Sequence, residues 1–94
     1  MMPARHVPGS RIAHAGHVVS SASADGALIV DMRTGRRTRL DHFGGRLWQA
    51  LSSQPTLSAL VASLRDDGTP AERLAEDVTR LVARWQVQGM IEWR

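Results

Sequence analysis

The sequence contains no cysteine and no lysine, and it has no long apolar run. Without cysteine the chain can form neither disulfide bonds nor thiolate metal sites. Apolar runs such as residues 27–30 are far too short for a membrane-spanning helix or for the core of a signal peptide. We therefore expect a soluble, cytoplasmic protein with no membrane partner.

The charge balance is modest for a chain in which all basic residues are arginine. The 94 residues include 12 basic and 9 acidic residues, which gives a net charge of +3. This charge is too small to require a nucleic-acid partner. The length allows one domain with one modest core, which excludes a multi-domain enzyme.

The residue groups that support catalysis are also missing. An enzyme needs a nucleophile with its base, paired carboxylates or a metal, held on rigid elements. The four histidines, His6, His14, His17 and His42, include no pair at the i, i+4 spacing of a helical metal site. Glycine-rich phosphate-binding motifs are absent as well. The sequence therefore predicts a protein that is not an enzyme and that binds no cofactor and no metal.

The chain divides into a short lead-in and one domain. Residues 1–13 carry two prolines and a glycine with little periodicity, which predicts a loosely held N-terminal segment. The domain is expected to span residues 14–94.

Three strands are expected at the start of this domain. Residues 17–23 and 27–32 are strand-like and flank Asp25-Gly26, a dipeptide suited to a tight hairpin turn. A second turn at residues 33–35 leads into a third strand at residues 36–40. The pattern predicts a three-stranded antiparallel meander whose last strand lies on an edge.

Two short helices should follow the strands. Asp41 is a suitable N-cap for the first, and Phe43, Leu47, Trp48 and Leu51 recur at helical spacing. Trp48 is expected to anchor this helix in the core. Gly44 and Gly45 weaken the helix, which indicates that it crosses the sheet closely. Thr56 is a suitable cap for the second helix, with a stripe of Leu57, Leu60, Val61 and Leu64.

The third helix has the clearest boundaries. Thr69 is expected as N-cap, Pro70 at the first helical position and Glu72 in a capping box, with Gly89 at the end. Between these boundaries an apolar stripe is typical of a helix that lies on a core: Leu74, Ala75, Val78, Leu81, Val82 and Trp85. A short apolar tail follows at residues 90–93.

This arrangement of elements leaves a DNA-binding alternative open. A winged helix-turn-helix regulator could use the arginines of residues 33–46 as phosphate contacts. However, a recognition helix should begin with basic or amide side chains, whereas the third helix begins with Glu72, Glu76 and Asp77. These carboxylates would be repelled by phosphate, so we favour a protein that binds no nucleic acid.

The edge of the sheet offers a different kind of site. Arg36, Arg37 and Arg39 place charge on the last strand, which protects an open edge from aggregation. The same edge could accept a foreign strand through main-chain hydrogen bonds.

A set of short motifs occurs in an order that resembles the PqqD-like family, whose members recognise peptides in the modification pathways of ribosomally made peptides. The shared features are Asp25-Gly26, the strand "ALIVDM", Thr34-Gly35, Leu40-Asp41, Gly44, Leu47-Trp48, "AEDV" at residues 75–78, and Gly89-Met90-Ile91. The resemblance covers residues 17–93. It implies an α+β fold, a winged helix-turn-helix with a three-stranded antiparallel meander followed by three helices, and no catalytic activity.

The resemblance also implies a binding site and a partner. In this family the leader segment of a precursor peptide lies as an extra strand beside the third strand, and its side chains enter a groove against the third helix. Carried over to this chain, the leader-binding residues are Arg36, Arg37, Thr38, Arg39, Leu40, Leu74, Asp77, Val78 and Leu81. Many relatives carry an aromatic residue on this strand, whereas this chain has Thr38 flanked by arginines, so the pocket is expected to be shallower and more polar.

The pathway implied is that of lasso peptides. The hairpins are more similar to those of the stand-alone leader-recognition proteins of lasso-peptide clusters than to those of pyrroloquinoline quinone synthesis. The partners expected from this resemblance are the precursor peptide, a leader peptidase and an ATP-dependent cyclase.

Overall fold

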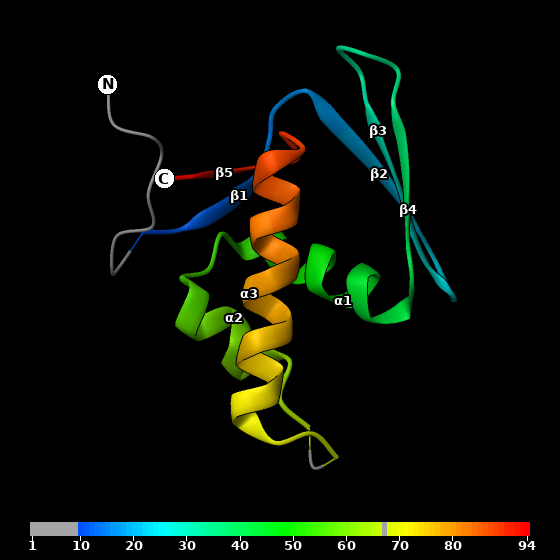
Figure 1. Cartoon of the computed structure of the whole chain (residues 1–94). Coiled ribbons are helices and arrows are strands. Elements are labelled where there is room, and N and C mark those ends of the chain that lie inside the picture. Colours follow the sequence, from blue (N-terminus) through cyan, green and yellow to red (C-terminus); the bar gives the residue numbers. More distant parts are fainter. Residues whose placement is uncertain (1–9, 67) are drawn as a thin grey trace.

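The computed structural model describes residues 10–66 and 68–94. Its long helix, α3, crosses the molecule between the meander with α1 and the smaller sheet with α2 (Figure 1). The elements follow one another as β1 (Ile12–His14), β2 (Val18–Ser23), β3 (Gly26–Asp31), β4 (Arg37–Leu40), α1 (His42–Ala50), the 3-10 turn η1 (Leu51–Ser53), α2 (Leu57–Ser63), α3 (Ala71–Val87) and β5 (Ile91–Trp93). The predicted α+β class, with a three-stranded antiparallel meander followed by three helices, is confirmed.

The meander has the strand order β2-β3-β4, so β4 lies on an edge as predicted. One detail of the prediction is wrong. Ser23 pairs with Gly26, so the first hairpin turns at Ala24 and Asp25, and Gly26 already belongs to β3. The second turn is held by the Asp31 carboxylate, which accepts hydrogen bonds from the Arg33 and Thr34 N–H groups at 2.8 and 3.2 Å.

A second sheet, which the sequence did not predict, joins the two ends of the described chain. β1 pairs antiparallel with β5, with Ile12 opposite Trp93 and His14 opposite Ile91. Ile12 is completely buried. The expected lead-in, residues 1–13, therefore extends too far, because β1 begins at Ile12. Residues 1–9 of this segment lie outside the described residues.

The first helix crosses the sheet at a point of very close approach. Asp41 caps α1 as predicted, since the Gly44 N–H donates to its side chain at 2.8 Å. A Cβ atom on Gly45 would lie 2.9 Å from the Gly26 Cα, which is too close for a side chain. The prediction that a small residue is needed at this crossing is confirmed.

Both ends of α3 are defined by local hydrogen bonds. The predicted N-cap, Thr69, is wrong by one residue, because Pro70 has an extended ψ of 140° and its carbonyl accepts the first bond of the helix from the Leu74 N–H. At the other end Gly89 has a φ of +74°, and the N–H groups of Gly89 and Met90 donate to the Gln86 and Trp85 carbonyls. These two bonds form the Schellman motif that ends a helix at glycine, as predicted.

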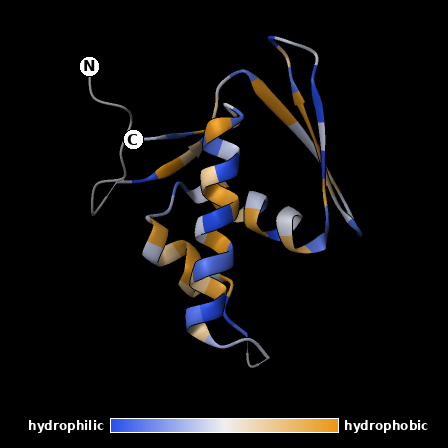
Figure 2. Cartoon of the chain, viewed as in Figure 1, coloured by the Kyte–Doolittle hydropathy of each residue, from blue (hydrophilic) through white to orange (hydrophobic). Residues whose placement is uncertain are grey.

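The core lies where the helices and the inner face of the sheet meet. Leu47 and Trp48 of α1 contribute to it, and Trp48 is only 2% exposed, which confirms its predicted anchoring role. Trp48 stacks on the His14 ring at 4.0 Å between centroids and meets Trp85 edge to face at 5.4 Å. Figure 2 shows hydrophobic residues on β2 and β3, whereas β4 is mostly hydrophilic.

Candidate functional site

The open edge of β4 carries backbone groups that point away from the sheet. The Asp31 N–H donates to the Arg36 carbonyl at 2.8 Å, so these two residues form a hydrogen-bonded pair. Such pairs alternate along antiparallel strands, which makes Thr38 the next residue bonded to β3. The N–H and C=O groups of Arg37 and Arg39 therefore face the open edge, where β4 has no neighbouring strand among the described residues.

Side chains alternate between the two faces of this strand. Leu40 belongs to the buried core, and Thr38, two residues earlier, is half-buried on the same inner face. Arg37 and Arg39 are exposed on the outer face. The inner face of the strand is therefore uncharged, with Thr38 and Leu40, and the outer face is basic. The backbone groups of Arg37 and Arg39 lie along the edge between these two faces.

A groove runs between this strand and α3. One hollow of about 340 Å³ lies directly against β4, and it is lined by Thr38, Arg39, Leu40, Asp41, Phe43, Gly44, Leu81, Arg84, Trp85 and Gln88. A second hollow of about 310 Å³ lies further along α3, and it is lined by Phe43, Thr69, Leu74, Asp77, Arg80, Leu81 and Arg84. Phe43, Leu81 and Arg84 line both hollows, so the two lie next to each other, and we refer to them together as the groove.

Most of the site residues predicted from the sequence surround this groove. Thr38, Arg39 and Leu40 line its β4 side, while Leu74, Asp77 and Leu81 line its α3 side.

Three of the predicted residues lie elsewhere. Arg36 lines a small hollow at the far end of β4, and Arg37 lies on the outer face. Val78 is completely buried in the core and lines neither hollow. The family resemblance that points to Val78 does not separate core positions from groove positions on the apolar stripe of α3.

Phe43, Arg84 and Gln88 also line the groove, but they are not among the residues that the sequence predicted for the site. Phe43 was predicted only as part of the helical pattern of α1, and it is half-buried and lines both hollows. Arg84 follows Leu81 by one turn of α3 and lies on the same side of the helix, so spacing from Leu81 could have found it. The Gln88 Oε1 atom is buried and has no hydrogen-bond partner in the described part of the chain.

The charges around the groove leave several arginines unpaired. Arg80 pairs with Asp77 at 3.5 Å, but both side chains are well exposed, so the pair contributes little stability. Within residues 10–66 and 68–94, neither Arg37, Arg39 nor Arg84 forms an ion pair. Arg39 and Arg84 therefore leave positive charge at the groove, and Arg37 leaves it on the outer face of β4.

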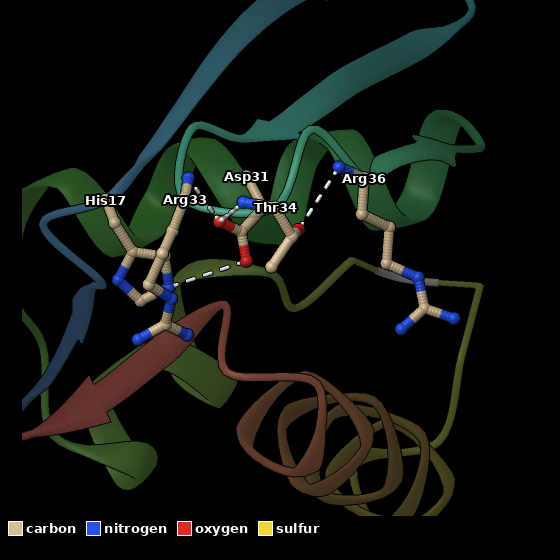
Figure 3. Close-up of polar contacts among 5 residues, drawn as sticks. All are labelled: His17, Asp31, Arg33, Thr34 and Arg36. Atoms are coloured by element: carbon tan, nitrogen blue, oxygen red, sulfur yellow. Dashed lines mark hydrogen bonds and ion pairs between the residues drawn. The ribbon is translucent and has the colours of Figure 1, made fainter.

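The turn before β4 is held by a small polar cluster (Figure 3). The His17 ring faces the Asp31 carboxylate at 3.6 Å, and the Arg36 N–H donates to the Thr34 hydroxyl at 3.2 Å. Burial acts to raise the pKa of the Asp31 carboxyl, but the N–H groups of Arg33 and Thr34 and the charges of His17 and Arg33 outweigh it. The pKa of Asp31 therefore lies below its ordinary value of 3.8.

Two further findings limit the kinds of site in the described residues. No group of three or more histidine, cysteine or acidic side chains comes together there in a way that could hold a metal ion. Of the helices in the same residues, none has both the length and the apolar character needed to cross a membrane.

Known structures with the same fold include two leader-peptide complexes. One is TbiB1 in complex with the TbiA(beta) leader peptide, with a TM-score of 0.79, 18% identity, and coverage of 85% of this chain and 94% of that chain. The other is lasso peptide synthetase B1 complexed with the leader peptide, with a TM-score of 0.77, 16% identity, and coverage of 87% and 98%. At these identities the likeness shows the fold, which is the PqqD-like winged helix-turn-helix.

Sequence comparison identifies the family. No curated protein sequence matches this chain. The family described as coenzyme PQQ synthesis protein D (PqqD) matches residues 26–91, which is well over half of the chain and includes β4, α3 and the groove between them. Members of this family are non-catalytic peptide-binding proteins. The chain belongs to the PqqD family of recognition elements for ribosomally made, enzymatically modified peptides.

Proposed function

We propose that this protein binds the leader segment of a ribosomally made precursor peptide by adding it as a strand to the edge of β4. The observation that carries the proposal is the outward-facing backbone of Arg37 and Arg39 beside the groove on α3. An extended peptide at this edge would gain main-chain hydrogen bonds from β4, and pockets for alternate side chains would give selectivity.

The groove supports an apolar anchor in the leader. Phe43 and Leu81 are both half-buried without a ligand, and they line both hollows. A leader side chain that packs between them would cover apolar surface on both residues, which stabilises the complex by about 25 cal/mol per Å² buried. We expect a leader affinity of roughly micromolar or better, equivalent to about −8 kcal/mol.

The pathway we favour is lasso-peptide biosynthesis, with pyrroloquinoline quinone synthesis as the next candidate. Two leader-bound structures share the fold, and one of them is lasso peptide synthetase B1. In this proposal the protein acts in the cytoplasm and delivers the bound leader to a leader peptidase and a cyclase of the same pathway. It performs no chemistry on the peptide itself.

A proline substitution on the open edge tests the binding mode. Arg39→Pro removes an N–H group that faces the edge, while the bonds of Thr38 and Leu40 to β3 are kept. Arg39→Ala is the matched control, because it removes the same side chain but keeps the N–H group. Titration calorimetry with a synthetic peptide of the leader encoded beside this gene should show about tenfold weaker binding for Arg39→Pro than for Arg39→Ala, the value of one lost hydrogen bond.

The groove is tested with the same peptide. Leu81→Ala should weaken binding by roughly 1–3 kcal/mol through lost apolar contact. Circular dichroism must show that each variant is folded. If folded Arg39→Pro and Leu81→Ala bind the leader as tightly as the wild type, the leader binds elsewhere and the proposal is wrong.

A further inference from the structure

The outer face of β4 has an unpaired positive charge at the position where a bound leader would lie. Arg37 is opposite Val30 on β3, and Val30 is opposite Val19 on β2, so this row across the sheet contains no carboxylate. The row of Arg39 contains Leu28 and Ser21, but Asp25 and Asp41 line the same hollow as Arg39. Arg37 is therefore the arginine with less compensating charge nearby.

A leader bound as an added strand would occupy the next position beyond β4 in each of these cross-strand rows. Residues that lie side by side on neighbouring strands project to the same face of the sheet, whichever direction the added strand runs. The leader residue beside Thr38 would project into the groove, towards Leu81 and Phe43. The leader residue beside Arg37 would project to the outer face, next to the exposed guanidinium group.

We propose that Arg37 is a specificity-determining residue that selects an acidic leader residue, directly adjacent in the leader sequence to the side chain that enters the groove beside Thr38. The inference rests on the proposed function, since it assumes that a leader pairs with β4. It defines the substrate class more narrowly, as an extended peptide with an acidic residue facing outward and its neighbour facing the groove. Arg39 should contribute less, because two carboxylates, Asp25 and Asp41, line the same hollow as Arg39.

This role differs from simple protection of the sheet edge. A charge that only prevents aggregation acts through the cost of burying it and through repulsion of other basic edges, so it requires no acidic residue at any one position of a ligand. A charge that selects the leader has one partner position, because cross-strand contacts reach the residue alongside most strongly. The two roles therefore predict different behaviour when the sign of the charge is reversed.

The test is a charge exchange between protein and peptide. Each position of the synthetic leader encoded beside this gene is replaced in turn by aspartate and by lysine. Fluorescence anisotropy then measures the affinity of each peptide for the wild type, for Arg37→Glu and for Arg65→Glu. Arg65 is exposed, follows α2 and lines neither hollow, so its reversal changes the net charge equally without touching the edge.

We expect one position at which the wild type prefers aspartate to lysine by about three- to tenfold, and at which Arg37→Glu reverses the preference. Arg65→Glu should keep the wild-type preference, and added salt should reduce it. If no position changes its preference between the wild type and Arg37→Glu while Arg39→Pro still weakens binding, the selectivity inference is wrong and the leader-binding proposal stands. If the natural leader does not bind the wild type at all, both are wrong.

Discussion

Two sets of polar contacts made by single side chains stabilise this fold, one in the interior and one at the surface. Inside, the His14 Nε2 atom lies 2.8 Å from the Trp48 carbonyl, and the His14 ring stacks on the Trp48 indole, so β1 is tied directly to α1. At the surface, the Asp31 carboxylate gathers two N–H groups of the turn that precedes β4. Because this turn aligns Arg37 with the open edge, its stability bears on the binding site.

The charge of Asp31 should stabilise the folded protein only at pH values above the range in which this carboxyl titrates. A carboxyl whose pKa is lowered in the folded protein adds stability above its ordinary value of 3.8, and that stability is lost as the pH falls through the folded value. Asp31→Asn keeps an oxygen for the Arg33 and Thr34 N–H groups but has no charge. In thermal melts the wild type should be more stable than Asp31→Asn near neutral pH, and the difference should close in acid. A difference that is constant down to strongly acidic pH would contradict this role of the charge.

Elements meet most closely where α1 crosses β3. The backbones of the helix and the strand come close together at Gly45 and Gly26. A side chain on either glycine would collide with main-chain atoms, which cannot move aside easily. This contact sets the distance between α1 and the sheet, and α1 carries Phe43, which lines the groove. The glycines cost helix stability, but they allow the helix to reach the sheet.

Replacing Gly45 by alanine should therefore destabilise the protein. Alanine is better than glycine in a helix by about 1 kcal/mol, but the clash with Gly26 should outweigh this gain and leave a net loss of roughly 1–2 kcal/mol. Gly16→Ala is a suitable control, because no heavy atom lies within 4 Å of the added Cβ. Urea titration measures both variants, and a stabilised Gly45→Ala would show that the helix can shift away from the sheet.

At the scale of the whole molecule, the two ends of the described residues pair with each other. Arg11 and Arg94 exchange backbone hydrogen bonds at 2.7 Å, and β1 and β5 lie between them and the core. The Ile12 N–H also donates to the Pro55 carbonyl, so the same strand fastens the segment before α2. The small sheet therefore couples the start of the chain to the helices that carry the groove.

Ile12→Ala should reveal this coupling as a large loss of global stability. The side chain is completely buried, and such truncations typically cost about 2–5 kcal/mol. Val19→Ala, at a position that is 53% exposed on β2, should change stability by less than about 0.5 kcal/mol. Equal unfolding midpoints for the two variants in urea would mean that β1 does not share in the cooperative fold.

The sequence by itself determined the order of the main elements and most of their ends. Asp41, Thr56 and Gly89 act through hydrogen bonds to residues a few positions away, so their roles can be recognised without knowing the fold. The apolar periodicity of α3 likewise shows which stripe is covered. Local chemistry leads directly to local structure in these cases.

The tertiary structure alone decided what joins distant parts of the chain. The strands β1 and β5 are too short to carry an alternating pattern, so their pairing could not be predicted from either segment. Phe43 and Val78 both lie on apolar stripes. Only the packing of α1 and α3 shows that Phe43 lines the groove while Val78 is buried in the core. Similarly, the sequence predicts a strand at residues 36–40, but the pairing register with β3 decides that the backbone groups of Arg37 and Arg39 face outward. The reason is that apolar burial is non-directional, so a periodic pattern shows that a face is covered but not by which element.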